Sequence, residues 1–205
     1  GGMDLADQMR RYVRWRDEGL WSSTGRCFDI GGTTSRQLLR FDRTGKPVDP
    51  DPNDDEAANG SLMRLAPVPI AWHRSVPEAA ERSGESSRTT HAARRPVDSC
   101  RLYGAMVAAV IGGATLDDVL APTFWQWGDL HPQVAAIAAG SFREKEPPAV
   151  RGTGFCIHTL EAALWAVHGA KDFRSAVLRA ANLGDDADTT AAIAGQLAGA
   201  WWGWS

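Results

Sequence analysis

The chain has 205 residues, of which 43% are hydrophobic and 23% are charged, and this composition is typical of one globular domain with a sizeable core. The formal net charge of −3 gives no electrostatic basis for binding nucleic acid or an anionic membrane. Cys27, Cys100 and Cys156 form neither a metal motif nor a disulfide framework, and no secretory leader is evident, so we expect a reducing cytoplasmic setting.

The N-terminal part predicts an amphipathic helix followed by a glycine-rich loop. Residues 4–18 carry apolar side chains at helical spacing, and Gly19 is a suitable stop. Asp29 lies in the following loop, and by itself it is better explained as a turn residue. Thr33 or Thr34 would cap a short helix ending near Leu39.

The next stretch is polar and then turns sharply. Residues 42–56 are rich in Asp, Pro and Gly, which predicts an exposed loop. Asn59 and Gly60 favour a turn, and a helical turn beginning there would offer backbone N–H groups to an anion, with Arg64 as a fixed cation. A plain turn before a short buried helix explains the same residues.

The middle of the chain predicts helices joined by polar segments. Residues 77–82 favour a short helix, residues 83–89 a polar linker, and residues 96–111 a long helix with Pro96 in its first turn. His91 lies just before this helix, and a lone histidine is more often structural than functional. Helical spacing recurs over residues 132–139, 157–169 and 172–182.

A second glycine-rich turn precedes the helix expected over residues 157–169. Gly152 and Gly154 permit close backbone approach, and Phe155 offers a ring beside them. This short pattern is weak by itself, because a turn followed by a core aromatic ring would look the same.

The most distinctive stretch is acidic and leads into an alanine-rich helix. Three carboxylates and two hydroxyls lie within residues 185–190. Asp186 and Asp188 face one point only if the chain is a loop there, so we predict a loop over residues 185–188. Clustered oxygen ligands without nearby Cys or His suit a hard cation, Mg²⁺ or Mn²⁺. N-capping by Asp188 or Thr189 explains the same pattern.

The helix that follows has one face almost without side chains, formed by Ala191, Gly195, Gly199 and Gly203. This spacing predicts that another backbone packs very close to it. All periodic segments are helical and none alternates like a strand, so the sequence predicts a single compact all-α domain over residues 1–205.

Residues 184–200 closely resemble the C-terminal motif of the ADP-ribosylglycohydrolase family. Three further stretches match that family in order: residues 59–67, Thr90 with His91, and residues 152–155. The resemblance implies an all-helical enzyme that binds two Mg²⁺ or Mn²⁺ ions. It also implies hydrolysis of the glycosidic bond that joins ADP-ribose to a protein side chain or a small acceptor.

The resemblance also implies roles for particular residues. Asp186 and Asp29 are the catalytic candidates, and Asp186 would share a metal with Asp188 and Thr189. Phe155 stands where the family commonly has Tyr, so it keeps a stacking surface without the hydroxyl. The residues expected to contact ADP-ribose are Asn59, Gly60, Ser61, Met63, Arg64, His91, Gly152, Thr153, Gly154 and Phe155.

One departure limits the expected activity. The family has early Gly-Asp-Ala-like and Thr-Asp-Asp segments that supply part of the metal shell, and these 205 residues contain no match to them. The chain is therefore either a fragment of a longer enzyme or a short member with an impaired metal site. We expect weak binding of at most one ion and little or no hydrolysis by these residues alone. The alternatives are an impaired ADP-ribose-binding module and a purely structural helical protein.

Overall fold

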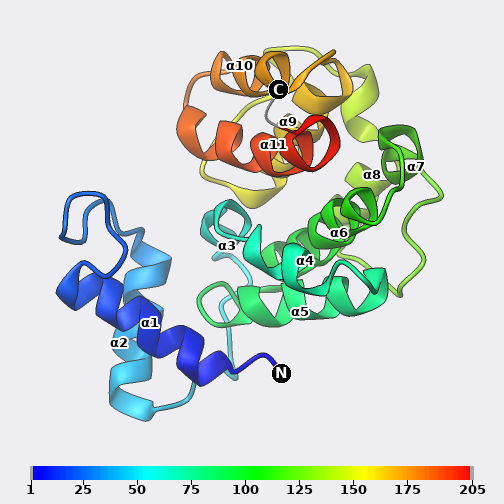
Figure 1. Ribbon diagram of the computed structural model, residues 1–205. Coiled ribbons are helices and arrows are strands. Elements are labelled where there is room, and N and C mark those ends of the chain that lie inside the picture. Colours follow the sequence, from blue (N-terminus) through cyan, green and yellow to red (C-terminus); the bar gives the residue numbers. More distant parts are fainter. Residues whose placement is uncertain (1, 204–205) are drawn as a thin grey trace.

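A computed structural model describes residues 2–203 and confirms the prediction of an all-α fold. Within these residues the backbone forms no strand, and an isolated antiparallel bridge joins Ala58 to Phe155. None of the described helices combines the length and the apolar character that a membrane crossing requires. Figure 1 shows the helices α1 (Leu5–Glu18), α2 (Gly32–Thr44), α3 (Gly60–Met63), α4 (Pro67–Trp72), α5 (Val76–Arg88), α6 (Arg94–Ile111), α7 (Leu116–Leu120), α8 (Pro132–Ala138), the 3-10 helix η1 (Ser141–Glu144), α9 (Cys156–His168), α10 (Phe173–Ala181) and α11 (Ala187–Trp202).

The first helix begins and ends where the sequence predicts. Asp4 precedes α1, and its Oδ1 accepts a hydrogen bond from the backbone N–H of Asp7 at 2.9 Å. Gly19 ends the helix in the left-handed region, with φ 69°. A Cβ at Gly19 would lie 2.3 Å from the carbonyl oxygen of Gly25, so only glycine fits this stop.

The second helix is longer than predicted. α2 begins at Gly32, so the predicted caps Thr33 and Thr34 lie inside its first turn, and no side chain caps it. The helix continues past Leu39 to Thr44, because the left-handed stop, Gly45 with φ 64°, lies beyond that point. The start of the segment predicted as an exposed loop is therefore helical.

The predicted polar linker over residues 83–89 is wrong. Residues 83–88 continue α5, which is one unbroken helix, and Ser83 and Gly84 are buried within it. A Cβ built on Gly104 of α6 would lie 2.0 Å from Ser83 Oγ, so the two helices touch at this point. The serines belong to this segment because they are small enough for close helix packing.

Helix α6 is the centre of the main body. It is buried along most of its length and contacts α3, α4, α5, α7, α8, α9 and α11. Tyr103 is fully buried, and its hydroxyl donates a hydrogen bond to the carbonyl oxygen of Ile193. This bond fixes α11, and with it the acidic stretch, against the centre of the core.

The glycine face of α11 packs against side chains and not against another backbone, so that prediction is wrong. A Cβ built on Gly195 would lie 3.7 Å from Val177, and one on Gly199 would lie 3.7 Å from Phe173. Both neighbours belong to α10. These distances are ordinary van der Waals contacts, so a methyl group would fit at both positions.

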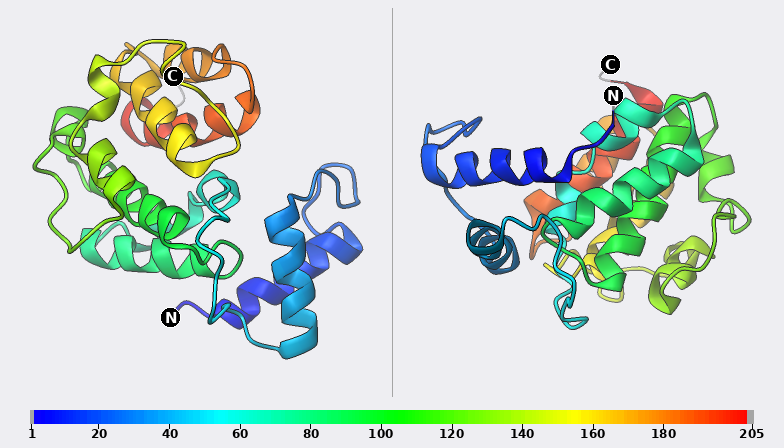
Figure 2. Two further views of the ribbon diagram at one scale, coloured as in Figure 1. Left: turned by 180° about the vertical axis from the view of Figure 1, so that it is seen from behind. Right: turned by 90° about the horizontal axis from the view of Figure 1, so that it is seen from below.

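Helices α1 and α2 form a pair that stands away from the main body (Figures 1 and 2). Helix α1 contacts the body where Gln8 donates to Ser86 Oγ at 2.8 Å and where Arg64 lies 4.9 Å over the Tyr12 ring. The loop after α2 contacts the body where Arg95 donates to the Asp54 carbonyl oxygen at 2.9 Å. The pair therefore rests on the body through polar and stacking contacts, next to α3.

Candidate active site

The acidic stretch is held at the start of α11 by its own backbone. Gly184 and Asp185 are both left-handed, with φ 74° and 57°, and they turn the chain out of α10. Asp186 is the N-cap residue of α11, but its side chain forms no capping bond. Its carbonyl oxygen accepts from the backbone N–H of Thr190 at 3.0 Å and from Thr190 Oγ1 at 2.8 Å. The Asp186 carboxylate is therefore free to point elsewhere.

Part of the loop prediction is wrong. Residues from Ala187 onward are helical, so Asp188 lies in the first turn of α11 and is exposed. Neither Asp188 nor Thr189 is the N-cap, because the left-handed residues before Asp186 end the loop earlier than the pattern suggests. Asp186 is thus the non-helical N-cap residue, whereas Asp188 has helical backbone.

The Asp186 carboxylate points at a residue far away in the sequence. Asn59 Nδ2 donates a hydrogen bond to Asp186 Oδ2 at 2.7 Å, across 127 positions of chain. Asn59 is buried, with 7% of its surface exposed, whereas Asp186 is half-buried. The structure thus brings together the first and last of the stretches that the sequence selected.

The loop over residues 152–155 completes this contact. The backbone N–H of Asp186 donates to the Gly152 carbonyl oxygen at 2.7 Å, and that of Asn59 donates to the Gly154 carbonyl oxygen at 3.1 Å. A Cβ on Gly152 would lie 2.5 Å from Thr190 Oγ1, which explains the glycine. Three segments meet here through backbone bonds, so their relative positions are fixed without a ligand.

Phe155 follows this loop and is half-buried. Its ring lies edge-on to His158 at 5.0 Å, and the guanidinium of Arg95 lies 6.0 Å from its centre. Thr153 Oγ1 is bonded to His158 Nδ1 at 2.9 Å. The ring thus stands beside the Asn59–Asp186 contact with a cation near its face.

The short helix α3 packs against a buried histidine. A Cβ on Gly60 would lie 2.9 Å from His91 Cε1, and the buried Ser61 accepts a hydrogen bond from Ser87 at 2.9 Å. His91 is 2% exposed, and its Nδ1 is bonded to Thr90 Oγ1 at 2.8 Å. Burial, together with the nearby positive charge of Arg64, lowers the pKa of His91 to about 3. His91 is therefore neutral at pH 7, and its ring packs directly against Gly60.

Arg64 joins α3 to two other helices. Its guanidinium donates to the carbonyl oxygens of Gly60 at 3.3 Å and of Ser86 at 3.1 Å, and it lies over the Tyr12 ring. Among residues 2–203, no carboxylate forms an ion pair with it. Arg64 therefore connects α3 to α1 and α5. Its positive charge is not neutralised by a carboxylate of the described residues and lies at the edge of the site.

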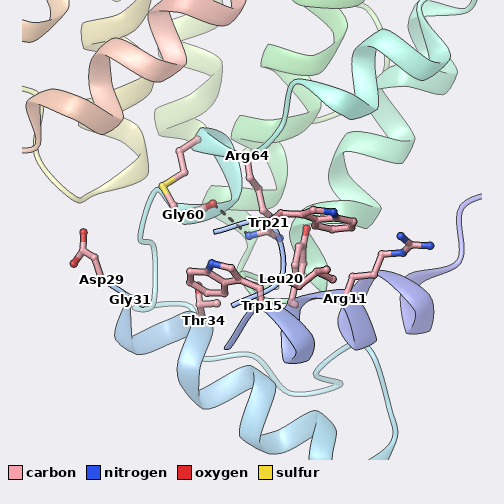
Figure 3. A pocket seen from close by; sticks show the side chains of 11 residues that line it. Arg11, Trp15, Leu20, Trp21, Asp29, Gly31, Thr34, Gly60 and Arg64 are labelled. Carbon is pink, nitrogen blue, oxygen red and sulfur yellow. Dashed lines mark hydrogen bonds between the residues drawn. The ribbon is translucent and has the colours of Figure 1, made fainter. Parts of the chain in front are cut away.

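A cavity of about 240 Å³ lies between α1 and α3 (Figure 3). Asp29 stands at its rim on a left-handed backbone with φ 51°, is exposed, and has no hydrogen bond or ion pair among the described residues. The cavity is lined by Arg11, Tyr12, Trp15, Leu20, Trp21, Asp29, Gly31, Thr34, Gly60, Met63 and Arg64. Three of the lining residues, Tyr12, Trp15 and Trp21, are aromatic, and Gly60, Met63 and Arg64 are shared with the sequence-predicted binding residues.

The described residues do not complete a two-ion metal site. Within residues 2–203, no three His, Cys, Asp or Glu side chains lie close enough together to hold a metal ion. One oxygen of Asp186 is bonded to Asn59, Asp188 is exposed, and Thr189 Oγ1 lies 4.0 Å from Met63 Sδ. Each Mg²⁺ or Mn²⁺ ion requires about six ligands. We therefore assign no chemical step to a metal.

Sequence reasoning missed two residues of this site. Thr159 is fully buried in α9 and accepts a hydrogen bond from Asn59 Nδ2 at 3.0 Å, and Thr190 is fully buried against Gly152. Both are single hydroxyls on otherwise apolar helix faces. Thr159 stands one helical turn after Phe155, and this spacing was the only sign that it faces the loop.

Comparisons with known proteins match the chain over nearly its full length. The family model described as ADP-ribosylglycohydrolase matches residues 1–205. A protein of Pseudomonas putida (strain GB-1) named ADP-ribosylarginine hydrolase Tri1 is 40% identical over 203 residues, which are 99% of this chain and 54% of that protein. A protein of the same name from Serratia proteamaculans (strain 568) is 37% identical over 100% of this chain and 55% of its own length.

Two further matches extend the comparison. A Rhodospirillum rubrum protein, named as a glycohydrolase of ADP-ribosyl dinitrogen reductase, is 27% identical over 99% of this chain and 63% of its own length. A solved structure named ADP-ribosylglycohydrolase-related protein complex has a TM-score of 0.82 at 36% identity, over 98% of this chain and 65% of that one. The chain thus spans about half the length of the first two relatives.

Proposed function

The chain belongs to the ADP-ribosylglycohydrolase family, and from this premise we propose that its site hydrolyses the N-glycosidic bond between ADP-ribose and an arginine side chain of a modified protein. The choice of arginine is supported by two relatives, 40% and 37% identical, whose names specify ADP-ribosylarginine. A rate limited by the incomplete cation shell is part of the proposal, because the described residues hold too few metal ligands.

One observation carries the proposal: Asn59 and Asp186 meet at 2.7 Å beside the Gly152–Phe155 loop. A helix cap would direct the Asp186 carboxylate at its own backbone, but this carboxylate forms no capping bond. The carboxylate is half-buried, and its Oδ1 has no partner among the described residues. One oxygen is therefore fixed and the other is available to a ligand.

This geometry suits a general base. In the proposed reaction, Oδ1 of Asp186 accepts a proton from a water molecule whose oxygen attacks the anomeric carbon of the ribose. The bond from that carbon to the guanidine nitrogen breaks, and the electron pair leaves with the guanidine, which takes up the proton from Asp186 and so returns the carboxylate to its ionised form. Asn59 holds the carboxylate in place during the attack, which lowers the entropic cost of reaching the reactive geometry. Asp29 is the second candidate for the base, from the rim of the cavity.

The remaining residues would hold the substrate. Phe155 offers a face for the adenine or ribose, and the unneutralised charge of Arg64 favours the pyrophosphate. His91, being neutral and buried, would act on the substrate through Gly60. If ADP-ribose contacts Phe155 and Arg64 in this way, the cavity beside α1 is left for the acceptor part of the substrate.

The test is release of ADP-ribose from a protein modified on arginine, with the chain in excess over substrate and Mn²⁺ present. Slow release that requires the chain would support the proposal. The same protein modified on serine provides the acceptor comparison, and we expect slower release from it. If neither conjugate releases ADP-ribose, hydrolysis by this chain is contradicted.

The incomplete ligand set favours one alternative, an ADP-ribose-binding module without turnover. Calorimetry with free ADP-ribose separates the two, since binding without release supports the module. Phe155→Ala and Arg64→Ala should each weaken binding. If both leave the affinity unchanged, the pocket is misplaced. We also expect weak binding of at most one Mn²⁺ per chain, and tight binding of two would show ligands that we have not recognised.

A further inference from the structure

The bond between Asn59 and Asp186 is one link of a longer chain of hydrogen bonds. Asn59 Nδ2 also donates to Thr159 Oγ1 at 3.0 Å, and Thr159 Oγ1 in turn donates to the Thr153 carbonyl oxygen at 2.6 Å. Thr159 is fully buried in α9. Nothing in the reaction proposed above uses its hydroxyl.

The direction of this chain follows from its ends. A backbone carbonyl oxygen only accepts, so the Thr159 hydroxyl gives its single proton to Thr153 and presents a lone pair to Asn59. Asp186 also accepts. The nitrogen of the Asn59 amide, and not its oxygen, must therefore face both neighbours. If Thr159 lost its hydroxyl, the second amide proton would keep only the Thr153 carbonyl oxygen, at 3.4 Å.

An ordinary structural role does not explain the whole pattern. Threonine in a helix commonly donates to the carbonyl four residues earlier, and Thr159 does lie 3.1 Å from the Phe155 carbonyl oxygen. The shorter bond, however, goes out of the helix to Thr153. That bond orients the hydroxyl for Asn59, which a bond inside the helix would not require.

We propose that Thr159 is a positioning residue for Asp186 and acts through the side-chain amide of Asn59. Thr159 fixes one proton of the amide, and the other proton then holds Asp186 Oδ2, leaving Oδ1 free. The role of Asp186 as the reacting carboxylate rests on the hydrolase function proposed above. The orientation of the Asn59 amide does not depend on that function.

The direct test is NMR of the ¹⁵N-labelled 205-residue chain, with the Asn59 side-chain amide assigned by its loss in Asn59→Asp. In the unaltered chain, both amide protons should exchange slowly with solvent and have separate resonances. Thr159→Val keeps the shape and removes the hydroxyl, so one proton should exchange at least about tenfold faster. Thr159→Ser should restore slow exchange. Unchanged exchange in Thr159→Val would overturn the proposal.

The kinetic test separates positioning from stability. In single-turnover release of ADP-ribose, Thr159→Val should lower the rate constant about tenfold and change the substrate affinity less than about twofold, with Thr159→Ser close to the unaltered chain. Ser83→Ala removes another fully buried hydroxyl, one without a partner in the described chain, and should leave the rate unchanged. Equal rates for Thr159→Val and the unaltered chain would also overturn the proposal. If the unaltered chain releases nothing while the amide exchange changes as expected, the hydrolase function fails and the positioning role stands.

Discussion

The two sides of the candidate site differ in how firmly their carboxylates are held. On the inner side, Asp186 is fixed through its backbone N–H, its carbonyl oxygen and Oδ2, by three different segments of chain. Asp29 on the outer side is exposed and forms no side-chain hydrogen bond or ion pair among residues 2–203, and the same holds for Asp188 in the first turn of α11. A group that reacts must already be oriented, whereas a group that waits for a ligand or an ion need not be.

The attachment of the two sides differs in the same way. The inner side is built on α9 and α11, which pack against the central helix α6. Asp29 belongs to the loop between α1 and α2, the pair that stands away from the body (Figure 2). The inner side should therefore depend on core packing, and the outer side on the contacts of Arg64 with α1.

The largest expected effect comes from disturbing the inner side at Gly152. In Gly152→Ala the new Cβ would lie 2.5 Å from Thr190 Oγ1, so the loop must shift, and we expect the free energy of unfolding to fall by about 3 kcal/mol. Gly154→Ala is the matched control, because its Cβ would lie 3.9 Å from the nearest side chain, Asp186. Denaturant unfolding of both variants measures the difference. Equal stabilities would show that the loop is not tightly packed.

A smaller effect should come from His91, which lies beneath Gly60. Burial lowers its pKa to about 3, against 6.5 for an ordinary histidine. The unfolded chain therefore takes up the proton first as the pH falls, and stability is present above pH 6.5 and is lost below it. Between pH 6.5 and pH 5, His91 should account for a loss of about 2 kcal/mol in the free energy of unfolding.

The readout for His91 is the difference between the unaltered chain and His91→Gln at the two pH values. The variant should lose less stability on acidification, because glutamine does not titrate. The comparison is needed because burial also lowers the pKa of three histidines that are present in both proteins, His131, His158 and His168. Parallel losses in the two proteins would contradict a buried neutral His91.

The smallest effect should come from the outer side. Arg64→Ala removes the stacking on Tyr12 and the bonds to the carbonyl oxygens of Gly60 and Ser86, and we expect a loss of about 1 kcal/mol in the free energy of unfolding. Hydrogen exchange should rise in α1 and α2 but not in α11. Arg88→Ala is the control, because its 4.0 Å pair with Glu81 is exposed. Equal exchange in α1 for both variants would show that Arg64 does not hold the pair.

The sequence was sufficient for the all-α fold class, for several of the helices and for the stretches that meet at the site. Helical spacing located α1, α8 and α10 to within one or two residues, because apolar side chains on one face must be buried whatever the partner is. The motif residues Asn59, Gly152 and Asp186 were all selected from the sequence. That selection depended on the family resemblance, since each stretch was ambiguous by itself.

Other features could not be predicted because they depend on partners distant in the chain. The serines of α5 looked like a linker, since polarity is visible in a sequence and close packing against Gly104 is not. The start of α11 was misplaced because left-handed Asp185 ends the loop one residue before Asp186. Thr159 was missed because its role exists only through Asn59, which lies 100 positions away.

The central claim is that Asp186, held by Asn59, is the reacting carboxylate, and that the exposed carboxylates cannot replace it. The most direct test compares Asp186→Asn with Asp188→Asn in single-turnover release of ADP-ribose from a protein modified on arginine. Asp186→Asn keeps the size and removes the base, so the rate constant should fall at least about a hundredfold, whereas Asp188→Asn should lower it less than about tenfold. If Asp186→Asn retains most of the rate, or if the two variants lose equally, the claim is contradicted.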